Sequence, residues 1–276
     1  GEIAREGWFV DLSGWLTAED RDHYAADSLG PCWPSYHAEG GIWALPLDAA
    51  AQVASCRPDL LDRVEAEIPK TLDEVLALAA KARRHGLSVA CPFVGCDAVC
   101  TFLTLCANAG TPWPRGEGGL PERTAIIEVL KAMRGLAAAV DPRSFDLNPI
   151  GCYEAMSGAD EICYVPFGFG YSNYSRPDRR RPLRFADIPG LTQPDCRGAL
   201  LGGAGIGISS RCRHPEAAVD YARFLTSAAY QKQAYFANGG QPASLTAWRE
   251  ARLDAAALGF FKGTKSTLEG AYLRPT

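Results

Sequence analysis

Aromatic side chains on a glycine-rich stretch are the first candidates for chemistry in this sequence. Residues 168–184 read GFGYSNYSRPDRRRPLR, which places Phe169, Tyr171 and Tyr174 beside an arginine run. Large aromatic residues are normally core material. A loop that displays them either packs them locally or presents them to a ligand that is flat and partly apolar.

The arginine run that follows has two interpretations. Five arginines lie between Arg176 and Arg184, the strongest charge run of the chain. They form either a solvated loop or a contact site for an acidic or phosphorylated ligand.

The composition is that of an ordinary globular protein. The 276 residues are 47% hydrophobic and 22% charged, and the formal net charge is −4. A nucleic-acid-binding domain is expected to be basic, so we expect no nucleic-acid partner. No apolar run approaches the ~20 residues of a membrane span, and no charged-then-apolar leader is present in this chain.

Motifs for catalysis, metals and cofactors are weak. The stretch GGAGIG does not fit G-x-G-x-x-G, because Ile208 stands where the third glycine should be. The spacing of Cys91, Cys96, Cys100 and Cys106 is not a zinc pattern, and we expect ordinary buried thiols, with Cys96 and Cys100 on one helix face. The four histidines are scattered, although a cysteine–histidine pair could assemble in three dimensions. We therefore expect no catalytic residues, no metal and no cofactor.

Capping signals define the helices that must position the candidate residues. Thr71 and Glu74 form a T-x-x-E capping box, and Gly86 ends that helix. Asp97 is a candidate N-cap for a helix that runs to residue 109, and Asn148-Pro149 begins a short helix. Further helices are expected at residues 122–140, after His214-Pro215, and at 227–236.

Strands are expected between these helices. Residues 87–94, 161–167 and 199–210 read as buried strands, and residues 35–48 read as a hairpin with its turn at Gly40-Gly41. Strands and helices alternate, which predicts an α/β fold with partly parallel sheets.

Several separated stretches together resemble the extracellular solute-binding proteins of ABC transporters, in the carbohydrate-binding group that includes maltose-binding protein. The stretches are GGIWALPLDAAAQVASCRPDLLD, IPKTLDEVLALAAKA, YVPFGFGYSNYSR, LLGGAGIGISSRCRHPEAAVDYARFLTSAAYQKQAYFANGGQPAS and the closing LRP. Their order and spacing carry the resemblance over nearly the whole chain.

The resemblance implies a two-lobed α/β fold of the periplasmic-binding-protein type, with crossover hinge strands and ligand held between the lobes. Lobe one would hold residues 1–48 and 199–240, and lobe two residues 49–198 and 241–276. Relative to the family, both ends are expected to be missing and the first lobe to be incomplete. The implied partners are an ABC permease and its ATPase, the implied location is periplasmic or extracellular, and a monomer is expected.

Site residues follow from what a sugar or polyol requires. Sugars have apolar C–H faces and polar rims, so their receptors use aromatic rings for the faces and carboxylates or amides for the hydroxyls. Within the resemblance, Phe169 and Tyr171 would stack on the ligand, and Asn173 or Tyr174 would hydrogen-bond it. The alternative is that these rings only close a local core.

Other candidates come from the remaining family stretches. Asp48, after the apolar strand, could accept hydroxyl hydrogen bonds or act as a turn residue, and Asp97 could do the same or cap its helix. Gly203, with its neighbour Gly202, would let ligand approach the backbone or form a simple bulge. Gln241 would bind a hydroxyl, Tyr36 or Trp33 would lie at the rim, and Trp43 would lie in the core.

Two other functions remain open from the sequence. One is an α/β enzyme that acts on a small polar substrate, and the other is a truncated relative that binds nothing. A screen of sugars for thermal stabilisation separates them, because a receptor gains stability with its ligand and an enzyme turns it over.

Overall fold

The computed structural model describes residues 6–114 and 119–275. Its first half contains η1 (Leu12–Gly14), α2 (Ala18–Asp27), α3 (Cys32–Ser35), β1 (His37–Ala38), β2 (Gly41–Ile42), β3 (Leu45–Cys56), α4 (Pro58–Arg63), α5 (Leu72–Arg84), β4 (Ser88–Val89), α6 (Cys96–Asn108) and α7 (Arg123–Ala139). Its second half contains η2 (Pro142–Phe145), α8 (Pro149–Gly158), β5 (Ile162–Phe169), η3 (Ser172–Ser175), β6 (Arg184–Ala186), β7 (Leu201–Ile206), α9 (Pro215–Thr226), α10 (Ala228–Tyr230), the π-helical η4 (Gln231–Tyr235), α11 (Leu245–Trp248), α12 (Ala251–Ala256) and α13 (Phe260–Glu269).

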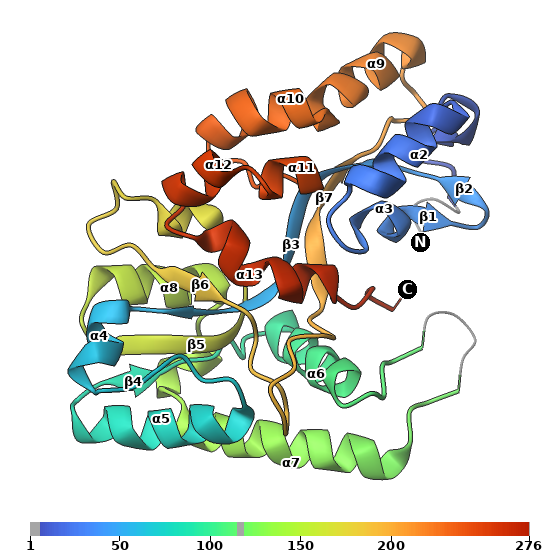
Figure 1. The fold of residues 1–276 in the computed structure, drawn as a ribbon. Helices are drawn as coiled ribbons and strands as arrows, with labels where there is room; N and C mark the ends of the chain where they lie inside the picture. The colour runs from blue at the N-terminus through green and yellow to red at the C-terminus, as the bar shows by residue number, and fades with distance from the viewer. Residues whose placement is uncertain (1–5, 115–118, 276) are drawn as a thin grey trace.

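The twelve-residue strand β3 joins the two parts of the molecule. Its first half pairs antiparallel with β7, from Leu45 opposite Ile206 to Ala51 opposite Leu201. Its second half pairs antiparallel with β5 and β6, and β4 adds to β5 in parallel. Figure 1 shows β3 and β7 running from the upper part, which holds α2, α3 and α9, to the lower part, which holds β4, β5, α5 and α7.

Two apolar clusters lie on either side of this crossing. The smaller one packs residues from α2, α3 and α9 around the start of β3: Leu12, Leu16, Tyr24, Trp33, Ile42, Leu45, Ile208, Val219 and Ala222. The larger one fills the lower part, where α5 packs on β4, α8 on β5, and α13 on β3 and β6. Burial of these apolar faces is the main stabilising term.

Most predicted helices are confirmed together with the capping that predicted them. The Asn148 side chain accepts from the backbone N–H of Gly151 at 2.8 Å, at the start of α8. Thr71 caps α5 in the same way, by accepting from the N–H of Glu74. The carboxylate of Glu74, however, accepts from the N–H of Lys70 instead of Thr71, so the capping box is displaced by one residue.

The hairpin is confirmed, but its turn lies one residue earlier than predicted. Ala38 pairs with Gly41, so the turn residues are Glu39 and Gly40, both with positive φ (52° and 76°). That combination matches the right-handed twist of the paired strands. The strand predicted over residues 87–94 forms only at Ser88–Val89.

The tryptophan assignments are reversed in the structure. Trp33 is buried and stacks on Tyr24, with ring centroids 5.1 Å apart, so it belongs to the core. Trp43 is only half-buried and donates its indole N–H to the carbonyl of Ala38. The prediction of buried thiols holds for Cys100, whereas Cys96 is exposed.

Within residues 6–114 and 119–275, no helix combines the length and apolar character needed to cross a membrane.

Candidate functional site

The candidate site lies where β3 changes its strand partners. Asp48 pairs with Ala204 of β7 and also forms an isolated bridge with Pro242. Further along β3, Gln52 pairs with Phe169, the last residue of β5. The crossing of β3 and β7 therefore brings three distant segments of the chain to one place.

Glycines of β7 provide the surface on which two aromatic rings lie. A Cβ on Gly202 would come within 2.7 Å of the Phe169 ring, and a Cβ on Gly205 within 2.6 Å of the Tyr36 ring. Only glycine leaves room for rings this close to a strand. Ring packing thus accounts for the glycine-rich stretch, and the next helix, α9, begins only at Pro215.

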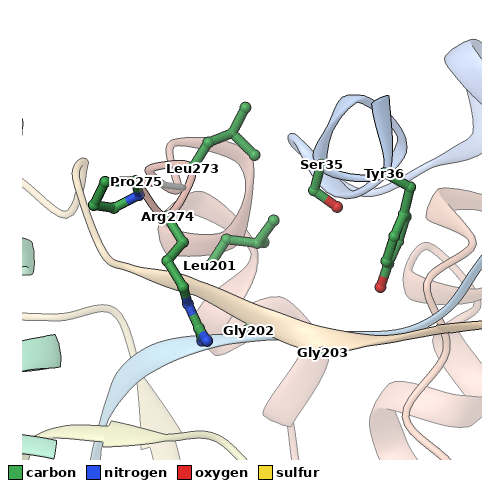
Figure 2. A pocket seen from close by; sticks show the side chains of 8 residues that line it. All are labelled: Ser35, Tyr36, Leu201, Gly202, Gly203, Leu273, Arg274 and Pro275. Atoms are coloured by element: carbon green, nitrogen blue, oxygen red, sulfur yellow. The ribbon is translucent and has the colours of Figure 1, made fainter. Parts of the chain in front are cut away.

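Two neighbouring cavities open over this part of β7. The Tyr36 cavity has a volume of about 260 Å³ and is lined by Ser35, Tyr36, Leu201, Gly202, Gly203, Leu273, Arg274 and Pro275 (Figure 2). The Asp48 cavity has a volume of about 290 Å³ and is lined by Asp48, Ala50, Phe169, Tyr171, Gly202, Gly203 and Arg274. The two share Gly202, Gly203 and Arg274, so a ligand in either one meets the β7 backbone.

Asp48 is a half-buried carboxylate with an unusual protonation equilibrium. Burial raises its pKa to about 6, although hydrogen bonds from the Gln241 backbone N–H and the Tyr235 side chain oppose that rise. A carboxylate in this position is a strong hydrogen-bond acceptor above pH 6 and becomes a donor below it. The predicted acceptor for ligand hydroxyls is therefore placed in a cavity, with its protonation set by burial.

Phe169 and Tyr171 line the Asp48 cavity together, as the aromatic loop of the sequence suggested. Phe169 is half-buried at the end of β5, and Tyr171 is 37% exposed. The Tyr171 ring contacts Tyr153 edge-on, with centroids 6.3 Å apart. The Phe169 ring thus packs on β7 and the Tyr171 ring packs on the core, and both rings remain partly exposed in the cavity.

Asp97 lies near this cavity without lining it. It is buried in the first turn of α6, and Gly95 takes the N-cap position that we predicted for Asp97. Burial raises the pKa of the Tyr171 hydroxyl, and the charges of Asp48 and Asp97 raise it further. The structure therefore brings both predicted acids close to Tyr171, but only Asp48 faces a cavity.

Asn173 and Tyr174 do not reach the two cavities. Tyr174 is buried and donates its hydroxyl to the Glu154 carboxylate at 2.6 Å. Asn173 is exposed, and its carbonyl accepts from the Arg179 side chain. Both residues belong to the short helix η3 and line neither cavity, so the structure does not place them among the ligand contacts.

The Gln241 side chain forms hydrogen bonds within the protein. Its amide nitrogen donates to the carbonyls of Ala49 and Gly170, at 2.6 and 3.2 Å, and its oxygen accepts from the Ser172 N–H at 2.9 Å. All three partners are backbone groups of β3 and of the loop after β5. Gln241 therefore fixes the loop that carries Tyr171 to β3, and we replace its predicted role as a hydroxyl partner with this one.

Replacing Gln241 by leucine is expected to lower the free energy of unfolding by about 1–3 kcal/mol, because buried backbone groups lose their partners. Urea unfolding measures the change. The exposed Gln233 of η4 offers the matched control, Gln233→Leu. Equal stability of the two variants would contradict the bridging role.

Two polar residues that line the Tyr36 cavity, Ser35 and Arg274, were not predicted to be site residues. Figure 2 shows the side chains of Tyr36 and Arg274 reaching toward β7 from separate elements, α3 and the C-terminal tail. Arg274 lies within the closing LRP stretch, which we had used only as a mark of resemblance. Its charge at the end of a family stretch was the one available signal.

None of the five arginines of the run lines either cavity, and three of them contact other side chains of the protein. Arg176 lies 3.7 Å above the Phe236 ring, and Arg181 pairs with Asp160 at 3.0 Å. Arg180 and Arg184 are exposed, as expected for a solvated loop, and the run offers no anion site at the two cavities. Among the described residues, no three His, Cys, Asp or Glu side chains come together as a metal site.

The class of fold is shown by comparison with solved structures. The chain has the two-lobed α/β fold of ABC transporter solute-binding proteins and matches three solved structures at TM-scores of 0.76–0.80. By sequence, no protein-family profile and no curated protein matches it.

Three similar structures illustrate the relation. The maltose-bound MalE3 of T. maritima is 21% identical (TM-score 0.76), over 95% of this chain and 70% of that one. A solute-binding protein of Agrobacterium radiobacter K84 in complex with ribitol is 19% identical (0.78), over 100% and 72%. One from Thermotoga lettingae TMO, bound with α-D-tagatose, is 17% identical (0.80), over 99% and 71%. The second and third are solute-binding proteins of ABC transporters.

Proposed function

We propose that this chain is the receptor of an ABC importer for a sugar or a polyol. The observation that carries the proposal is the Asp48 cavity, where two aromatic rings and a carboxylate acceptor meet over a glycine backbone. This combination suits a hydroxylated ring with apolar faces. The similar folds bound to maltose, ribitol and tagatose support the same class of ligand.

The two lobes are proposed at residues 1–48 with 199–240, and 49–198 with 241–276. Two of the three proposed boundaries meet in space, because Ala49 donates its N–H to the Gln241 carbonyl. The third, between residues 198 and 199, lies further along β3, where the Gln52 N–H donates to the Leu200 carbonyl. A few backbone segments that meet at one point are suited to act as a hinge. Closure about them would enclose ligand between Tyr36 of the first lobe and Tyr171 of the second.

The remaining parts of the proposal follow from the class. Partners would be a permease and its ATPase, the receptor would act as a periplasmic or extracellular monomer, and it would release its ligand unchanged. The enzyme and the non-binding relative are the competing functions. Turnover of a stabilising sugar would favour the first, and no stabilisation by any solute would favour the second.

The aromatic pair supplies the direct test. Once a stabilising sugar is found by thermal shift, Phe169→Ala and Tyr171→Ala are each expected to weaken its binding about tenfold, since stacking contributes about 1 kcal/mol or more per ring. Isothermal titration calorimetry measures the affinity.

Tyr221→Ala is the control, because Tyr221 is 61% exposed on α9 and lines neither cavity. The proposal would be abandoned if both cavity variants bound the sugar as tightly as the unchanged protein.

A further inference from the structure

Arg274 is a cation that the fold leaves unmatched. It lines both cavities, and its side chain extends across Gly202 (Figure 2). Within the described part of the chain, no carboxylate pairs with its guanidinium, whereas Arg57 and Arg143 each hold two carboxylates. An arginine in a cavity without an internal partner is available to an external anion.

The surroundings of Arg274 suit a ligand with a charged end and a hydroxylated ring. The guanidinium is always protonated and presents planar, paired donors that match a carboxylate. Asp48 lines the same cavity but already accepts hydrogen bonds from Tyr235 and from the backbone of Gln241. Gly202 and Gly203 line this cavity together with both charged residues.

We propose that the ligand is an acidic sugar, whose carboxylate binds Arg274 while its ring lies on Phe169 and Tyr171 and its hydroxyls donate to Asp48. This inference rests on the proposed function and names its class of ligand. It assigns recognition of the anionic group to the C-terminal tail and not to the arginine run, since no arginine of that run lines either cavity.

The test compares three probes that share one ring: D-galacturonate, D-galactose and D-galactose 6-phosphate, with the matching gluco series alongside. Calorimetry on the whole chain should show the uronate bound at least tenfold more tightly than the neutral sugar, as expected for a charged hydrogen-bonded pair. Arg274→Gln should remove that preference, so that the uronate and the neutral sugar bind this variant with affinities within about twofold of each other. Arg180→Gln makes the same change of charge at an exposed loop position and should preserve it.

Each other result overturns the inference in a distinguishable way. If the neutral sugar binds as tightly as the uronate, or if Arg274→Gln still prefers the uronate, then Arg274 does not bind a ligand carboxylate. The proposed receptor function is unaffected by either result. If the sugar phosphate binds more tightly than the uronate, and this binding depends on Arg274, the ligand is a phosphorylated sugar and not an acidic one. Failure of both uronates to bind removes the inference, whereas the proposed function fails only if no sugar or polyol in the thermal-shift screen stabilises the chain. A melting curve of Arg274→Gln, which alters an exposed side chain, checks that the variant remains folded.

Discussion

Asp48→Asn is expected to weaken ligand binding about 100-fold while making the unliganded protein more stable. The loss of binding follows because the carboxylate can accept two charge-assisted hydrogen bonds, which an amide cannot replace. The gain in stability follows because burial raises the pKa of Asp48 to about 6. Above that pH, folding must bury a charge that the variant lacks.

The pH dependence of this gain has a definite sign. The folded state holds the Asp48 proton more tightly than the unfolded state, so the cost of ionisation grows as the pH rises from about 4 to 6 and is complete above 6. At pH 8, Asp48→Asn should add about 1–2 kcal/mol to the free energy of unfolding, and at pH 4 almost nothing.

Urea unfolding at both pH values, with calorimetric titration of ligand, measures the two effects. Asp22→Asn, on the exposed surface of α2, is the matched control and should change neither the free energy of unfolding nor the affinity for ligand. A loss of stability in Asp48→Asn at pH 8 would show that the carboxylate supports the fold, and unchanged affinity would remove Asp48 from the site.

Gly203→Ala is expected to lower the free energy of unfolding by about 2–5 kcal/mol. Gly203 has φ of +94°, which L side chains rarely adopt, and a Cβ there would lie 2.3 Å from the Asp48 carbonyl oxygen. The backbone strain costs about 1–2 kcal/mol, and relief of the overlap between β3 and β7 adds about 1–3 kcal/mol. Separation of the strands would also move one wall of both cavities, so the folded variant should bind ligand more weakly.

Gly239→Ala separates these two contributions. Gly239 has a similar φ of +89°, but a Cβ there meets nothing within 4 Å. Gly239→Ala should therefore show the cost of backbone strain without that of steric overlap. The difference between the two variants in free energy of unfolding gives the cost of the overlap between β7 and Asp48. Equal costs would mean that the strands adjust freely and that Gly203 only relieves strain.

The aromatic loop shows how far a sequence pattern can locate a site. Its composition predicted that Phe169 and Tyr171 would stack on a ligand, and the structure places both at one cavity, while the contact with ligand stays a prediction. It could not separate them from Tyr174, which is buried against Glu154. A loop has no repeat that assigns alternate side chains to one face, whereas a strand or helix does.

Local signals in the sequence determined the helices, the class of fold and the buried apolar segments of the strands. Caps such as Asn148 act within three residues, and apolar periodicity acts within one element, so both can be read without a partner. Only the tertiary structure decided which side chains share a cavity. Arg274, near the C-terminus, lines a cavity with Gly202, whereas the Gln241 side chain donates to the Ala49 carbonyl and not to a ligand. Such contacts depend on how β3 and β7 cross, and that geometry results from packing between segments that are distant in sequence.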